Sequence, residues 1–187
     1  ARPLMSAYDG QTLGPGDTYD ATGYPIFQKF DGVDDGMATA AFPAGALING
    51  MDCMIPVRRD SAARGVLFSM AYPSAAYCGH YEAGSSFVGR DAVGTPTVWV
   101  DGVQLAGGTA VTAGTLDTAL TVGDWHIVEF RGLDLSAFTS FAFGNWLSGF
   151  QFNGARGDIM LYPSTDSTAD KDAARQYLAD YYGVTLP

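Results

Sequence analysis

The sequence predicts an all-β chain, built as a two-sheet antiparallel jelly-roll sandwich with one C-terminal α-helix. The 24 glycines and nine prolines are spread along all 187 residues, which is typical of many short elements joined by tight turns. Hydrophobic residues make up 47% of the chain, enough for a core, while charged residues reach only 16%. An average domain has about 25% charged residues, so this composition disfavours disorder, coiled coils and long solvated helices.

Short apolar or alternating runs recur along the chain, as expected for strands that bury one or both faces. The hairpin at residues 98–105 is the clearest, because Asp101-Gly102 between two apolar runs supplies the positive φ angles of a two-residue turn. The expected strands are residues 25–30, 36–42, 51–57, 65–70, 86–88, 97–100, 103–105, 116–122, 126–130, 140–143 and 158–162.

One stretch, residues 167–183, predicts a helix. Ser167 and Asp170 are spaced as a capping pair, and Gly183 suits the left-handed residue that ends a helix. Between these ends, apolar residues follow helical spacing: Ala173, Ala174, Tyr177, Leu178 and Tyr181. We expect the sandwich and this helix to occupy residues 25–187, preceded by an N-terminal arm, residues 1–24, that could act as an anchor.

The charge balance bears on the class of partner. The formal net charge is -10, only Lys29 and Lys171 are lysines, and the eight arginines are dispersed. A nucleic-acid-binding surface needs clustered basic side chains, so we expect no nucleic acid partner. Since no apolar run approaches a membrane span and no charged-then-apolar leader is seen, we expect a chain with no membrane span that is made in the cytoplasm. Cys53 and Cys78 fall in apolar runs and are expected to be buried thiols.

Three segments resemble the concanavalin A-like, laminin-G-like jelly-roll superfamily. They are Phe30-Asp31-Gly32-Val33-Asp34-Asp35, the hairpin at residues 98–105, and the closing strand and helix that ends Tyr177-Leu178-Ala179-Asp180-Tyr181-Tyr182-Gly183-Val184. Residues 122–136 look like versions of this domain in tailed-bacteriophage virion proteins, although residues 124–129 follow the hairpin, which departs from the commonest laminin-G order. The superfamily includes lectins, glycosidases and structural modules, so the fold does not choose among them.

A lectin-like role needs exposed aromatic faces and polar groups that bond sugar hydroxyls. Two segments, residues 72–77 and 144–149, read as loops in which such side chains can be exposed. The candidate carbohydrate-binding residues are Tyr72, Tyr77, Tyr81, Trp99, Asn145 and Trp146.

Two clusters of polar residues are candidates for metal binding. Asp31, Asp34 and Asp35 form a compact acidic turn that could hold calcium, although we favour a structural turn in which the carboxylates accept backbone amides. Three residue types that bind zinc stand at alternate positions, namely Cys78, His80 and Glu82, but the sequence indicates no fourth ligand. We therefore expect no obligatory cofactor, with calcium as the alternative.

Catalysis is the least favoured function. Glucanases of the superfamily carry a Glu-x-Asp-x-x-Glu-like strand, which the residues after Glu129 do not match, and His126 beside Trp125 reads as a structural imidazole. We expect a non-enzymatic bacteriophage virion protein that binds host-surface glycan, is present in several copies or as a homo-oligomer, and contacts other virion proteins. A capsid decoration or tail accessory protein with a docking role is the first alternative, and a glycoside hydrolase is the second.

Overall fold

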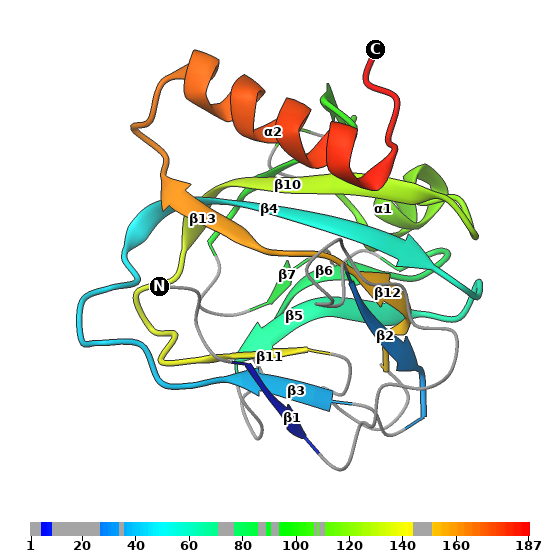
Figure 1. Cartoon of the computed structure of the whole chain (residues 1–187), viewed down its shortest axis with the longest axis horizontal. Helices are drawn as coiled ribbons and strands as arrows, with labels where there is room; N and C mark the ends of the chain where they lie inside the picture. The colour runs from blue at the N-terminus through cyan, green and yellow to red at the C-terminus, as the bar shows by residue number, and fades with distance from the viewer. Residues whose placement is uncertain are drawn as a thin grey trace.

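The computed structural model describes residues 5–8, 27–33, 36–70, 77–85, 89–90, 94–106, 108, 111–143 and 151–187. Two antiparallel sheets pack face to face, and a C-terminal helix lies across the outer surface of one of them, so the fold has three layers (Figure 1). This confirms the predicted all-β sandwich.

The first sheet has six strands. It runs β1-β3-β11-β5-β6-β7, and its pairs are antiparallel. The strands in that order are Met5–Tyr8, Gly36–Thr39, Phe141–Phe143, Gly65–Met70, Tyr77–Tyr81 and Gly89–Arg90.

The second sheet has seven strands and carries the helix. Its order is β2-β12-β4-β10-β8-β9, and β13 pairs with the first half of β4 while β12 pairs with the second half. The strands in that order are Gln28–Asp31, Asn153–Arg156, Asn49–Arg59, Trp125–Asp134, Thr97–Val100 and Val103–Gln104, with β13 at Met160–Pro163.

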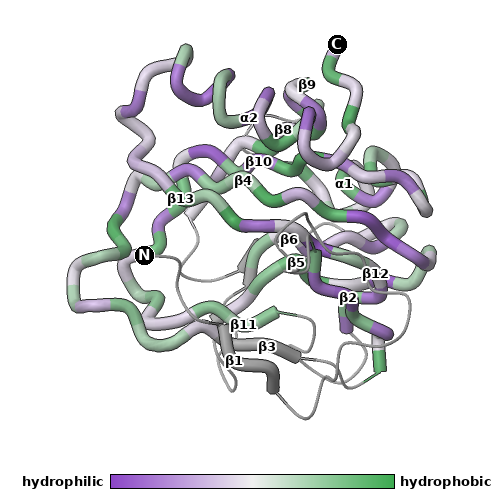
Figure 2. The backbone as a smooth tube through the Cα atoms, viewed as in Figure 1, coloured by the Kyte–Doolittle hydropathy of each residue, from purple (hydrophilic) through white to green (hydrophobic). Residues whose placement is uncertain are grey.

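Strand alternation divides the buried residues between the two faces of this sheet. Cys53 and Ile55 of β4 and Phe130 of β10 belong to the core between the sheets. Met54 of β4 and Ile127 of β10 point the other way and pack under the helix. Burial is continuous from Met51 to Val57 in β4, as expected for a strand with a layer on each side, and Figure 2 shows hydrophobic residues along both central strands, β4 and β10.

The predicted hairpin and helix are both confirmed. Asp101 and Gly102 have φ of 52° and 82° between β8 and β9, as a two-residue turn requires. Helix α2 covers Thr168–Tyr182, with Ser167 accepting the Asp170 amide and Gly183 left-handed at the end. The buried stripe differs from the predicted one, because Tyr177 and Tyr181 are exposed while Tyr182 is buried.

The structure corrects one predicted strand and adds a second helix. Residues 116–122 were expected to form a strand, but Ala113–Ala119 form helix α1, capped by Thr112. Leu116 and Leu120 are both fully buried, and their spacing of four places them on the same helix face. Two apolar residues four apart fit a helix, whereas the short apolar run over residues 116–122 had indicated a strand.

Two further predictions concern the cysteines and the N-terminal residues. Cys53 and Cys78 are free, buried thiols, as predicted, and burial raises the pKa of both. Within the expected arm, residues 1–24, the structure describes only β1, which pairs with β3 at the edge of the six-stranded sheet.

Candidate functional site

The most unusual chemistry in the described residues lies between α2 and the seven-stranded sheet. Strand β10 places Glu129 and Arg131 on the face turned toward α2, opposite the core residue Phe130. The register puts Glu129 beside Trp99 of β8, and Arg131 beside Asp52 of β4. Two carboxylates and their cations thus share one face of the sheet.

Glu129 is fully buried and holds two arginines. Arg175 of α2 donates to both carboxylate oxygens, and Arg131 donates to Oε2 from Nε and Nη2 at 3.1 and 2.8 Å. Asp172 accepts a hydrogen bond from Nη1 of Arg175 at 2.8 Å. The hydrogen bond to Glu129 is the main reason that the pKa of Arg175 is raised above its usual value.

Asp52 makes the second anchor. Its buried carboxylate lies 2.8 Å from Nζ of Lys171 and accepts hydrogen bonds from the Ser164 hydroxyl at 2.5 Å and the Gly132 amide at 2.9 Å. Lys171 also donates to the Ser164 carbonyl at 2.8 Å. The first turn of α2 is therefore fixed to β4 and β10 by charge-assisted bonds.

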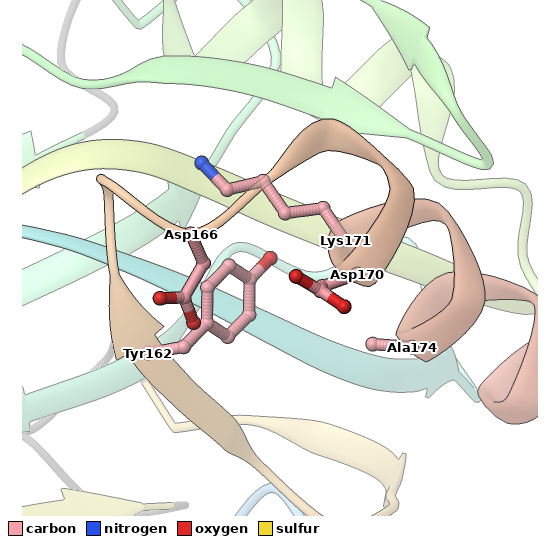
Figure 3. Close-up of a pocket in the computed structure, with 5 residues that line it drawn as sticks. All are labelled: Tyr162, Asp166, Asp170, Lys171 and Ala174. Atoms are coloured by element: carbon pink, nitrogen blue, oxygen red, sulfur yellow. The ribbon is translucent and has the colours of Figure 1, made fainter.

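A small hollow opens beside this anchor, at the start of α2 (Figure 3). It has a volume of about 160 Å³ and is lined by Tyr162, Asp166, Asp170, Lys171 and Ala174. Figure 3 shows the Tyr162 ring with the carboxylates of Asp166 and Asp170 on either side of it in that view. An aromatic ring, two carboxylates and an ammonium group thus line one concavity.

Tyr162 is the residue that makes this hollow chemically distinctive. Its hydroxyl is buried and has no hydrogen-bond partner among the residues that the structure describes. Burial, followed by the nearby charges of Glu129 and Asp52, raises the pKa of this phenol, so it is neutral and able to donate at neutral pH. An unpaired buried hydroxyl is costly, and a bound polar molecule would satisfy it.

The acidic groups of the hollow differ in availability. Asp170 accepts the Ser167 hydroxyl at 2.6 Å as part of the helix cap. The Asp166 carboxylate is exposed and accepts no hydrogen bond from the described part of the chain. Asp166 is therefore the free acceptor at the rim.

The carbohydrate-binding residues predicted from the sequence are not brought together among the described residues. Tyr81 is 1% exposed, below the Arg59 guanidinium at 4.9 Å, so its ring offers no free face. Trp99 is half-buried, and the Arg131 guanidinium covers its ring at 4.0 Å. Only the backbone of Tyr77 is described, in β6, and three candidates lie outside the described residues: Tyr72, Asn145 and Trp146.

The acidic turn is described only in part. Asp31 accepts the Val33 amide at 2.7 Å, the turn geometry favoured from the sequence, whereas Asp34 and Asp35 lie outside the described residues. Among residues that the structure describes, no group of three or more His, Cys, Asp or Glu side chains is placed to hold a metal ion. Whether calcium binds at this turn stays a prediction.

A third polar cluster, at Asp101, His126 and Thr121, was not predicted as a unit. His126 Nδ1 lies 2.7 Å from Asp101, and Nε2 lies 2.8 Å from the Thr121 hydroxyl and 3.1 Å from its amide. Because an amide only donates, Nε2 is the acceptor and Nδ1 carries the proton.

This order of hydroxyl, imidazole and carboxylate resembles a nucleophilic triad. However, the Thr121 amide shares the lone pair that a triad needs for its hydroxyl, and Asp101 also accepts the Ile127 amide at 2.8 Å. Both ring nitrogens are satisfied, so His126 is a structural imidazole, as predicted, that ties the hairpin turn to β10.

Neither helix in the described part of the chain is long and apolar enough to cross a membrane. Comparison of the chain with protein-family models, with curated proteins and with solved structures found no match.

Proposed function

We propose that this chain is a non-enzymatic, lectin-like module of a tailed-bacteriophage particle, and that it binds glycan through the hollow at the start of α2. The observation that carries the proposal is the buried, unpartnered Tyr162 hydroxyl beside the free Asp166 carboxylate. The hollow is a different site from the predicted loop residues, of which Tyr72, Asn145 and Trp146 lie outside the described residues and stay a prediction.

The chemistry of the hollow suits a sugar. A pyranose has an apolar face that packs on an aromatic ring and hydroxyls that both donate and accept. Tyr162 supplies the ring and a donor, and Asp166 supplies an acceptor. Drug-sized ligands occupy pockets of about 300–1,000 Å³, so a hollow of about 160 Å³ fits one small ring.

A non-enzymatic role is supported by the state of the buried acids. A glycosidase needs two carboxyl groups at the substrate, one of them held protonated. The two carboxylates of the hollow, Asp166 and Asp170, are exposed, and Asp170 is engaged in the helix cap. The buried acids, Glu129 and Asp52, are paired with cations and covered by α2. Their arrangement favours a structural role.

The resemblance to phage virion domains supports the setting. A shallow site of this size binds weakly, and display in several copies on a particle raises its effective affinity. Other virion proteins are then the natural partners, and bacterial surface polysaccharide is the natural ligand.

A glycan array of bacterial polysaccharides, followed by calorimetric titration of the strongest hit, tests the proposal. Tyr162→Phe should leave the melting temperature unchanged or higher, because the lost hydroxyl has no partner, and should weaken binding about fivefold. Asp166→Asn should weaken binding by a similar factor. Asp124→Asn, an exposed acid outside the hollow, is the matched control and should change nothing.

An array without signal would contradict the glycan-binding proposal. Co-sedimentation of the same protein with phage particles would then favour the docking alternative. Release of reducing sugar from any hit would contradict the non-enzymatic part alone.

A further inference from the structure

The hollow continues onto a stripe of helix α2. Asp170, Ala174, Tyr177 and Tyr181 are separated by four, three and four residues, which places them on one face of the helix. Asp170 and Ala174 line the hollow, so the two tyrosines lie beyond its edge on the same face. At 1.5 Å per residue the stripe is roughly 16 Å long, which is more than one sugar ring spans.

The two tyrosines are unusually placed for such large side chains. Tyr177 is 57% exposed and Tyr181 is 42% exposed, and they are the exposed aromatic residues of the described chain. Their rings are nearly parallel, with an interplanar angle of 13° and centroids 6.2 Å apart. They therefore present two similarly oriented faces rather than scattered contacts.

Packing restrains this pair from below. Tyr181 meets Tyr182 edge to face at 5.1 Å, and Tyr182 is buried with its hydroxyl accepting the Asp158 amide at 3.1 Å. Tyr182 also packs against Trp125 of β10 at 4.8 Å. A ring already held in place loses less conformational freedom when a ligand binds on it.

The charges around the stripe select the ligand. The basic residues Lys171 and Arg175 turn inward and are paired with Asp52 and Glu129. The acidic groups Asp166, Asp170 and Asp180 face solvent. An anionic polysaccharide would be repelled here, whereas a neutral or amino-bearing glycan would not.

We infer that the hollow and the Tyr177–Tyr181 stripe together bind a chain of neutral or amino-bearing sugars, with one ring at Tyr162 and the following rings stacked on the two tyrosines. The inference rests on the proposed function and extends it to a ligand class and a chain length. A protein partner is the less suitable occupant, because stable protein interfaces bury about 800 Å² per partner around an apolar centre. Here two rings stand beside three carboxylates.

Calorimetry with monomers and tetramers of glucose, glucosamine and galacturonic acid tests this on the full chain. We expect the glucose or glucosamine tetramer to bind about tenfold more tightly than its monomer, and the galacturonic acid tetramer not to bind. In Tyr177→Ala/Tyr181→Ala the tetramer advantage should fall to about twofold or less, with monomer binding unchanged. Tyr177→Phe/Tyr181→Phe keeps both ring faces and should keep the advantage.

These outcomes separate the two proposals. If a monomer binds in a Tyr162-dependent way but the alanine variant retains the tetramer advantage, the inference is wrong and the proposed function stands. The inference is also wrong, and the proposed function stands, if the galacturonic acid tetramer binds best. The same conclusion follows if the alanine variant keeps its saccharide affinities and loses only its binding to phage particles. If no saccharide binds, both are wrong. A melting temperature within a few degrees of the parent verifies that the alanine variant is folded. We expect this result because alanine has the highest helix propensity and both positions are exposed.

Discussion

The two faces of the seven-stranded sheet are stabilised in different ways, although neighbouring residues of the same strands form them. In β10, Phe130 points into the core and meets Phe68 edge to face at 5.9 Å. Glu129, one residue earlier, points toward α2 and is satisfied only by arginines. The inner face is largely aromatic and aliphatic, but it also holds two buried arginines. Arg59 of β4 lies over the Tyr81 ring, and the Arg156 guanidinium lies 3.5 Å from the Phe143 ring centre, with its pKa lowered by burial to about 9.

The two faces have different roles: the inner face stabilises the sandwich, and the outer face positions α2. Apolar burial is nondirectional, so the inner face holds the sheets together without fixing every angle. Buried ion pairs have a desolvation cost close to their attraction, and they require good geometry. The pairs Glu129–Arg175 and Asp52–Lys171 therefore fix where α2 lies, and with it the hollow and the tyrosine stripe.

The largest expected effect comes from breaking the inner face. Phe130→Ala removes a fully buried ring between the sheets and should lower the free energy of unfolding by about 4 kcal/mol. Urea unfolding measures the loss, which should be the same at low and high salt because no charge is involved. A loss below about 1 kcal/mol would show that the core refills the cavity.

Glu129→Gln should lower the free energy of unfolding by about 3 kcal/mol, because Arg175 and Arg131 then lose their shared buried carboxylate and Arg175 is left with the exposed Asp172. The same urea experiment measures it, and loss of sugar binding should accompany it if the pair positions the hollow. Glu129→Leu/Arg175→Leu is the control. It removes the carboxylate together with Arg175 and leaves Arg131, which is partly exposed and lies over the Trp99 ring, so its loss should be at least about 1 kcal/mol smaller than that of Glu129→Gln. Equal losses in the single and double variants would contradict the comparison.

The packing of α2 should also be sensitive to alkaline pH. Burial raises the pKa of Tyr182 from 10.0 to about 12, so the folded protein keeps a proton that the unfolded chain loses. The free energy of unfolding should therefore be unaffected below pH 10 and fall as pH rises from 10 toward 12. Melting temperatures across this range measure the fall.

Tyr182→Phe should be about 1 kcal/mol less stable at neutral pH, since the Asp158 amide loses its acceptor, but its alkaline fall should be shallower. Tyr81 and Tyr162 have pKa values raised in the same direction, so part of the fall should remain. An identical alkaline slope in parent and variant would exclude Tyr182 as a contributor.

The smallest effect is expected where charge pairing is exposed. Arg58 and Asp60 lie 2.9 Å apart with about a quarter of each side chain exposed. Asp60→Ala should change the free energy of unfolding by less than about 0.5 kcal/mol. If it costs as much as Glu129→Gln, burial is not what distinguishes the two ion pairs.

The sequence predicted correctly the turn and the helix cap, whose conformation depends on neighbouring residues in the chain. The Asp101-Gly102 turn and the Ser167 cap are determined by residues within a few positions, and both are confirmed. Strand β12 was missed because Asn-Gly-Ala-Arg has no apolar alternation, and Arg156 is buried only through its neighbours. The sequence predicted a strand where α1 lies, because a short apolar run with a single helical repeat, Leu116 to Leu120, does not distinguish a helix from a strand.

The candidate site could not be predicted in the same way. Asp52, Glu129, Tyr162 and Lys171 are scattered over more than half the chain, and only strand pairing and helix docking bring them together. The sequence did single out aromatic residues as sugar contacts, but exposure depends on the neighbours. Tyr81 is covered by the core, whereas Tyr177 and Tyr181 are exposed because α2 turns its other side to the sheet.

The sequence by itself determined a chain of short strands joined by tight turns, closed by one capped helix, because backbone conformation at turns and caps follows from adjacent residues. The tertiary structure decided which face of α2 is buried, which carboxylates are paired and where a hollow remains. Those outcomes depend on desolvation and on contacts between residues far apart in the chain, and no local pattern records them.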